Sequence, residues 1–369
     1  MLNRIWEILG IGIIDRYILK KYLQTFFYSL LLFSLIAIFI DVSEKMNDFI
    51  RRKPPLFVLI FDYYIYFIPW FMGLFSSVFA FLATLLFNAK LAQNSEIIAI
   101  LNSGVKYPKF LKPYLLGATF LFLIFLLLNT HIIPRAEKYK LKFEDDWIHD
   151  RKPTENNNLY SMLNDSSVIH MESFNYTDSI GFNVVLECFS QSRLISRVYA
   201  GRLIWDKQKQ IWSLEGYRNR IFNADGSEII LKRERLDTVL LIKPDEFIVK
   251  SKYISSMTNP ELNEFIRKEV EKGSAGTGKY YVELYKRTSI PFAFYVLTIM
   301  AVAVSSSKSR GGMGFSLGLG VIITFVYLLF IQVFSTMGNS GVIPAWVAVW
   351  APTFIFMLIA LLLLRLAPK

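Results

Sequence analysis

The sequence predicts an α-helical membrane protein with six transmembrane helices in a 3+3 arrangement and an inserted all-β, jelly-roll-like domain. Two observations carry this prediction: six long apolar segments, and a polar stretch at 134–287 that separates the third segment from the fourth. A bilayer core of roughly 30 Å requires about 20 helical residues, and most of the segments reach that length. The fourth is short unless its helix begins nearer Tyr285. The apolar segments lie at 22–40, 56–87, 113–133, 290–304, 315–336 and 343–364.

Composition and charge support a membrane protein and argue against nucleic-acid binding. The chain is 53% hydrophobic and 16% aromatic, more apolar than a soluble domain with one core requires. Its net charge is +11, but the polar stretch holds 25 Lys and Arg against 23 Asp and Glu, a net of +2. The excess positive charge therefore lies beside the apolar segments, and the polar domain has no basic excess suited to nucleic acid.

The positive charges also predict the orientation of the chain. Lys and Arg in short loops favour the cytoplasmic side of a membrane. If both termini are cytoplasmic, twelve such residues lie on that side and four, Lys45, Arg51, Arg52 and Lys53, lie opposite. The polar domain then lies outside the cytoplasm. The twelve are Arg4, Arg16, Lys20, Lys21, Lys90, Lys106, Lys109, Lys112, Lys308, Arg310, Arg365 and Lys369.

Short alternating runs separated by turn residues predict antiparallel strands from about 158 to 252. Asp225-Gly226 between two such runs is typical of a tight hairpin. The strands are expected to form a sandwich or an open jelly roll, whose apolar face is either core, the favoured interpretation, or a cradle for acyl chains. A helix follows, with Asn259 as its cap, Pro260 as its first residue and Gly273 as its stop. The predicted domains are 1–133, 134–257, 258–287 and 288–369.

No residue pattern predicts catalysis, a metal or a cofactor. Residues 273–279 match G-x-x-x-x-G-K, but Tyr280 stands where a magnesium-binding Ser or Thr is required, and a helix precedes the run instead of a strand. Clear ionisable residues occur only at the ends of the spans, at Asp41, Asp62 and His131, which weakens a proton- or sodium-coupled carrier. The single cysteine, Cys188, is interpreted as a half-buried strand residue.

The loop between the second and third segments predicts a short amphipathic helix at about 94–104. Asn94 or Ser95 can cap it, Glu96 complements its positive end, and Gly104 stops it. Ile97, Ile100 and Leu101 share one face at i, i+3 and i+4. Such a face can rest against lipid or dock into a groove on a soluble partner, and both alternatives stay open on physical grounds.

This loop resembles the coupling helix of the lipopolysaccharide export permeases LptF and LptG. The family pattern is roughly L-A-x-x-S-E-[LIV]-x-x-[LM]-x-x-[SA]-G. Further motifs resemble the family's in the same order along essentially the whole chain. The motif near the N-terminus and the loop are more similar to LptG than to LptF. The matching residues are Leu91, Ala92, Ser95, Glu96, Ile97, Ile100, Ser103 and Gly104 in the loop, and elsewhere Ile14-Asp15-Arg16-Tyr17, Pro134-Arg135-Ala136-Glu137, Pro244-Asp245-Glu246 and Tyr281-Val282-Glu283-Leu284-Tyr285.

The resemblance implies the permease subunit of an ABC transporter in the inner membrane of Gram-negative bacteria, with its β domain in the periplasm. Its expected partners are an LptB-type ATPase dimer, a paralogous LptF-type permease subunit, an LptC-type periplasmic protein, lipopolysaccharide and the membrane. ATP hydrolysis belongs to the separate ATPase, so no ATPase site is expected here. The alternatives are a secondary carrier of amphipathic lipids and a membrane-anchored scaffold with an external β domain.

The resemblance also assigns residue roles. Coupling to the ATPase is expected of Ser95, Glu96, Ile97, Ile100, Leu101 and Gly104. Contact with the phosphorylated lipid is expected of basic residues at the outer ends of the first and third spans: Lys45, Arg51, Arg52 and Arg135. A lysine that the family carries nearer the middle of the first span is replaced here by Ile38 or Phe39.

The charge bias leads to a test of topology. Cys188 is expected to react with a membrane-impermeant thiol reagent added outside the inner membrane, once unfolding exposes it. A cysteine introduced by Lys308→Cys is expected to be protected from the same side. Labelling at position 308 without labelling of Cys188 would reverse the orientation.

Overall fold

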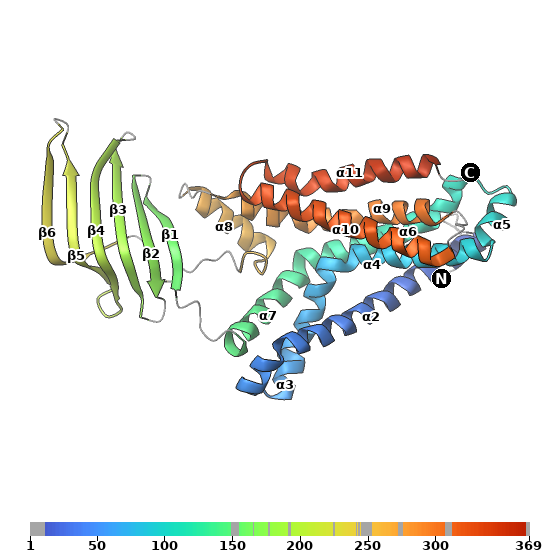
Figure 1. Cartoon of the computed structure of the whole chain (residues 1–369), viewed down its shortest axis with the longest axis horizontal. Helices are drawn as coiled ribbons and strands as arrows, with labels where there is room; N and C mark the ends of the chain where they lie inside the picture. The colour runs from blue at the N-terminus through green and yellow to red at the C-terminus, as the bar shows by residue number, and fades with distance from the viewer. Residues whose placement is uncertain are drawn as a thin grey trace. The chain divides into compact units, whose positions relative to one another are not determined.

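Six helices of the computed structural model are long and apolar enough to cross a membrane, and they run side by side in one bundle (Figure 1). Two of them are continuous through a π-helical turn. The structure describes residues 12–148, 155–164, 166–175, 178–190, 193–223, 226–240, 242, 244, 253–271, 276–306 and 312–366. The helices are α2 (Ile13–Arg52), α3–η1–α4 (Leu56–Val58, Leu59–Tyr64, Ile65–Gln93), α6–η2–α7 (Tyr107–Leu127, Leu128–Ile132, Ile133–Trp147), α9 (Gly278–Ser305), α10 (Gly312–Asn339) and α11 (Ala345–Leu366).

Some residues used in the sequence predictions lie outside the described part of the chain. They are Arg4, Asp225, Asp245, Glu246, Gly273, Lys308, Arg310 and Lys369.

The fourth span is longer than its apolar segment. Helix α9 begins at Gly278, well before Tyr285, and continues through Pro291 to Ser305. The extra turns at its start carry polar residues, which is why the apolar run alone underestimates its length. The most apolar window of α9 is 72% buried inside this chain, against 11% for α10. Helix α9 is therefore the interior helix of the bundle, and α10 is a peripheral one.

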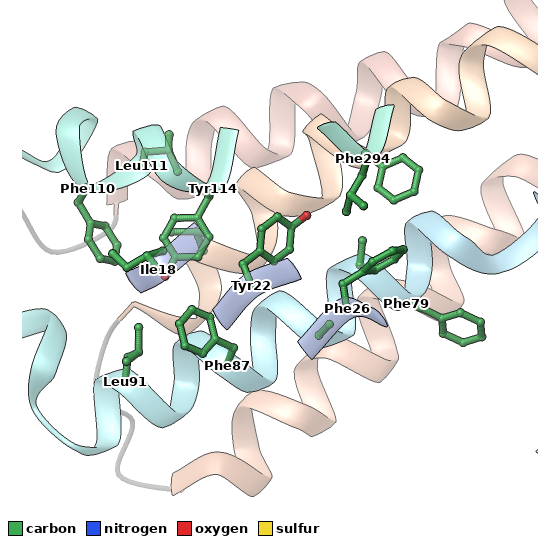
Figure 2. Packing of buried hydrophobic residues seen from close by; sticks show 14 of the residues in the cluster. Ile18, Tyr22, Phe26, Phe79, Phe87, Leu91, Phe110, Leu111, Tyr114 and Phe294 are labelled. Atoms are coloured by element: carbon green, nitrogen blue, oxygen red, sulfur yellow. The ribbon is translucent and has the colours of Figure 1, made fainter. Parts of the chain in front are cut away.

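Aromatic side chains form much of the core that joins the first three spans to α9. Tyr22 and Phe26 of α2, Tyr114 of α6 and Phe294 of α9 are each at most 1% exposed and belong to one cluster (Figure 2). The Phe26 ring meets Phe294 edge-on, with centroids 6.1 Å apart. Large rings of this kind bury much area and hold helices at defined angles. The N-terminal and C-terminal sets of spans thus share one core.

The inserted domain contains a six-stranded antiparallel sheet with the strand order β1-β2-β3-β4-β5-β6. Each strand pairs with its neighbours in sequence, so the sheet is a meander, simpler in order than a jelly roll, and the described strands form an open sheet instead of a sandwich. Gly226, with φ 85°, forms the predicted hairpin between β5 and β6. The strands are β1 (Glu155–Asn164), β2 (Ser167–Asn175), β3 (Ile180–Ser190), β4 (Arg193–Asp206), β5 (Ile211–Phe222) and β6 (Glu228–Thr238).

One face of the sheet carries a buried apolar cluster centred on Trp212. Trp212 is fully buried, and its indole N–H donates to the carbonyl of Ile242 at 2.8 Å. Met171, Phe174 and Leu203 are also fully buried in this cluster. Cys188 lies half-buried in β3, as the sequence predicted. The face is thus packed over its centre by side chains of the domain itself.

By its contacts the chain divides into two compact units. One consists of Met1–Phe143, Ser255–Leu262 and Gly278–Lys369, and the other of Glu144–Ile254 and Asn263–Thr277. Helix α8 (Asn259–Glu271) starts one residue earlier than expected, because the Thr258 N–H bonds to the Glu261 carboxylate at 2.8 Å and caps the helix. The finer division at 133, 257 and 287 stays a prediction.

Glycines in the spans differ in how closely this chain packs on them. A Cβ at Gly117 would lie 2.4 Å from two ring carbons of Tyr22, and one at Gly320 would lie 2.9 Å from Leu85. A Cβ at Gly314 or Gly318 would meet no atom of the described residues within 4 Å, apart from its own helix backbone and chain neighbours. Gly117 and Gly320 thus serve contacts within the subunit, whereas this chain's own packing does not explain Gly314 and Gly318.

Gly117→Ala is therefore expected to destabilise the isolated subunit, because the added methyl group overlaps a buried aromatic ring. Overpacking of this kind typically costs about 1–3 kcal/mol. Thermal unfolding of the detergent-solubilised chain measures the effect, and Gly318→Ala is the matched control with an expected shift near zero. Equal midpoints for the two variants would show that the contact between α6 and α2 is not tight.

Candidate functional site

The loop between the second and third spans folds into the short helix α5 (Glu96–Asn102). It lies at the end of the bundle where α2 begins and α11 ends (Figure 1). Ser95 at its N-cap has φ 64°, and Gly104 after it has φ 86°. These left-handed residues let the chain turn sharply on both sides of α5, and Gly104 adopts this conformation at least cost. A helix of seven residues is marginal alone, so packing must hold it in place.

The apolar face of α5 packs against the spans of its own chain. Ile97 is 1% exposed and belongs to the core cluster of the spans, and Ile100 and Leu101 pack against the same cluster. These residues attach α5 to its own chain, since burying one such side chain contributes about 1.5–3 kcal/mol. Ile97 is thus covered by its own chain, while Ile100 and Leu101 are half-buried, and the coupling role of all three stays a prediction.

The outward face of α5 consists of different residues. Ile98 is 46% exposed, and Ala99 and Asn102 are exposed on neighbouring positions. Ile98 and Asn102 are four residues apart and lie on one side of the helix. A large apolar side chain ringed by small and polar ones is a typical docking feature.

Glu96 stands at the first turn of α5, half-buried at the surface. The Asn94 side-chain amide donates to its Oε1 at 3.0 Å, and the Tyr17 hydroxyl lies 3.5 Å from its Oε2. These contacts orient the carboxylate, which also complements the positive end of the helix. Ser95 makes no side-chain cap bond, so its hydroxyl does not start the helix.

At the opposite end of the bundle, Lys45 is engaged within the chain. Its ammonium lies 2.7 Å from the carboxylate of Asp41, bonds the hydroxyl of Tyr63 and stands over the Tyr63 ring. The Tyr63 and Tyr64 hydroxyls donate to the two oxygens of Asp41 at 3.1 and 3.2 Å. The π-helical turn η1 allows these adjacent tyrosines to reach one carboxylate. A ligand phosphate would have to compete with Asp41 for Lys45.

The other predicted basic residues are more open. Arg51 has 54% of its side chain exposed and pairs loosely with Asp48 at 3.6 Å, while Arg52 is half-buried. Arg135 is exposed at the start of α7. The C-terminal end of α2, which carries Arg51 and Arg52, points away from α5 (Figure 1).

Helix α7 sorts its basic side chains onto two faces. Arg135, Lys138 and Lys142 are exposed at i, i+3 and i+7, so they form one basic face. Lys140 points the other way: it is 6% exposed, and its ammonium stands 3.9 Å from the centroid of Trp70. Its cation–π contact helps to fix α7 against α4.

Fold and site together define a multi-span membrane protein that carries an inserted antiparallel β domain and a short exposed helix between its second and third spans. The sequence matches the family Lipopolysaccharide export system permease LptF/LptG over residues 16–366, and the chain belongs to that family. It is thus a lipopolysaccharide export permease, a multi-pass protein of the inner membrane and not a catalytic enzyme. No curated protein matches the sequence. The preference for LptG over LptF stays a prediction.

Sequence patterns missed Ile98 and the partners of Lys45 and Lys140. The period of α5 assigns Ile97, Ile100 and Leu101 to one face, but nothing in it tells whether that face meets the chain's own spans or a partner. Asp41 stands four residues before Lys45, a spacing that signals a helical ion pair. The contacts of Tyr63 and Tyr64 with Asp41 could not be predicted without knowledge of the π-helical turn.

Proposed function

We propose that this chain is the permease subunit of an ABC transporter that extracts lipopolysaccharide from the inner membrane and passes it toward the outer membrane. ATP hydrolysis is supplied by a separate cytoplasmic ATPase dimer of the LptB type. The observation that carries the proposal is α5, whose inner face packs against the spans and whose outer face leaves Ile98 exposed. A second permease subunit of the LptF type and an LptC-type periplasmic protein complete the assembly.

In this proposal α5 is the element that receives force from the ATPase. Ile98 enters an apolar groove on the ATPase, with Ala99 and Asn102 at its margin. Glu96 accepts a hydrogen bond from a donor of the ATPase, in addition to its contact with Asn94. The buried Ile97 supports the proposal, because a docking helix transmits movement only if it is attached rigidly to its own subunit.

The substrate role belongs first to exposed basic residues. Arg51, Arg52 and Arg135 are the better candidates to attract the phosphorylated head group, since guanidinium groups bind phosphate with paired hydrogen bonds. Lys138 and Lys142 extend the basic face of Arg135 along α7. Lys45 joins them only when a phosphate replaces Asp41 as its partner.

The proposal places no nucleotide site in this chain. Lys279 of the Gly-Lys run lies in the first turn of α9, beside the ring of Tyr280, and the element before it is helix α8. A phosphate-binding loop requires a strand in that place. Among the described residues no group of three or more His, Cys, Asp or Glu side chains could hold a metal ion.

Ile98→Asp tests the docking face. The subunit is expected to insert and fold normally, because Ile98 is exposed, yet its affinity for the ATPase should fall at least about tenfold, or ~1.4 kcal/mol, since a charge enters an apolar groove. Co-purification and ATP-driven lipopolysaccharide release from proteoliposomes measure the effect.

The matched control is Ile13→Asp. Ile13 is 88% exposed at the same end of the bundle but lies on α2, so ATPase binding should be unchanged. Full ATPase binding by Ile98→Asp would remove α5 as the docking element. Release driven by an ion gradient without any ATPase would instead favour a secondary carrier, and no release under either condition would favour a scaffold.

The two faces of α7 provide a second test. Arg135→Ala with Lys138→Ala is expected to weaken lipopolysaccharide binding by about tenfold, since loss of a charged hydrogen bond costs roughly 1.5–3 kcal/mol. Lys140→Gln, whose side chain is covered by Trp70, should leave binding nearly unchanged. Photo-crosslinking of lipopolysaccharide to the assembled complex compares them, and an equal loss in both variants would contradict a role for the exposed face.

A further inference from the structure

A fully buried amide joins three spans near α5. Asn88 of α4 is 0% exposed, and its Oδ1 accepts a hydrogen bond from the Tyr114 hydroxyl of α6 at 2.7 Å. Its Nδ2 donates to Ser305 Oγ at 2.9 Å, Ser306 Oγ at 3.3 Å and the carbonyl of Val302 at 3.4 Å, all at the end of α9. One side chain thus bridges α4, α6 and α9.

A second hydrogen bond strengthens the same junction. The hydroxyls of Tyr107, the first residue of α6, and Ser306 lie 3.1 Å apart. Ser305 and Ser306 also donate to carbonyls of the preceding turn, which fixes their hydroxyl oxygens as acceptors for Asn88. Every polar group of Asn88 therefore has a partner inside the protein, as an apolar environment requires.

The junction lies directly behind the helix that we assign to ATPase docking. Helix α5 connects the C-terminal end of α4 to the N-terminal end of α6, and these are the two helix ends that Asn88 and Tyr114 link. Ile97 of α5 and Val302 of α9 belong to the same buried cluster. A displacement of α5 therefore acts on α4 and α6 through the chain and on α9 through the amide of Asn88.

We propose that Asn88 is a positioning residue for transport, which transmits the displacement of α5 from the first three spans to α9. This rests on the proposed docking of an ATPase on α5. Apolar packing resists separation of helices but permits sliding, whereas hydrogen bonds are lost when donor and acceptor shift by a fraction of an ångström. The amide therefore locks the register of α9 against α4 and α6, and the ends of the three helices move as one body.

Two other pairs of hydroxyl groups also link α9 to neighbouring spans, but they differ from the Asn88 junction in the helices that they connect. Tyr22 of α2 pairs with Thr298 of α9 at 3.0 Å and also bonds Thr84 of α4, while Tyr295 of α9 bonds Thr119 of α6 at 3.0 Å. The Asn88 junction links α9 to α4 and α6, the two helices that flank α5. Loss of its amide is therefore expected to affect coupling more than assembly.

The test compares ATP hydrolysis with lipopolysaccharide release in proteoliposomes that hold the complete complex with its ATPase. Asn88→Leu keeps the number of side-chain heavy atoms and the branch at Cγ and removes the amide. Hydrolysis is expected to stay within about twofold of the wild type, while lipopolysaccharide released per ATP falls at least about fivefold, the lower end of measured coupling between sites. The control is Ser34→Ala, which removes a buried hydroxyl that donates to the Leu30 carbonyl of its own helix.

Tyr114→Phe removes a single hydroxyl from the junction and carries the test if Asn88→Leu does not assemble. Its release per ATP should fall in the same direction by a smaller factor. The inference is overturned if assembled variants keep the wild-type ratio, or if hydrolysis and release decline in proportion. Absence of ATP-dependent release in the wild-type complex is a different result, because it refutes the proposed function itself.

Discussion

Burial of a polar side chain inside the membrane-spanning part is costly unless the side chain has a hydrogen-bond partner within the protein, and several such pairs meet at α9. Helix α9 is enclosed by other spans over most of its apolar length. Its hydroxyl groups meet Tyr22, Thr119 and Asn88 from three different helices. Because each bond has a required direction and length, the partners set the register of α9 within the bundle. Aromatic packing then fills the space between these fixed points.

The same constraint divides the basic residues at the other end. Asp41 is buried in α2, so its charge must be compensated, and Lys45 with two tyrosine hydroxyls does so. Lys140 is likewise engaged by the ring of Trp70. Because Lys45 and Lys140 already have partners inside the protein, they are poor candidates for the initial binding of an anionic lipid. The exposed Arg51 and the basic face of α7 retain their charge at the surface, where long-range attraction of phosphate is effective.

Helix α5 shows how a short element acquires a function from its surroundings. Alone it is too short to be stable, and its buried isoleucine attaches it to the core formed by the first three spans and α9. The exposed part of α5 is a small surface around Ile98, on a helix that is held by the core of the spans. Membership of the lipopolysaccharide export permease family supports the proposal that this surface receives movement from an ATPase subunit.

The sequence by itself determined the class of protein, the six spans, the inserted antiparallel strands and the position of α5, because these depend on hydrophobic length, period and turn residues along the chain. Only the tertiary structure decided which side of α5 faces outward: Ile98 is exposed, whereas Ile97 is buried. It also decided that Lys45 pairs with Asp41, that Lys140 lies over the Trp70 ring, and that Asn88 is hydrogen-bonded to α9. Partners separated by many residues along the chain leave no local pattern, since the contact exists only once the helices have packed.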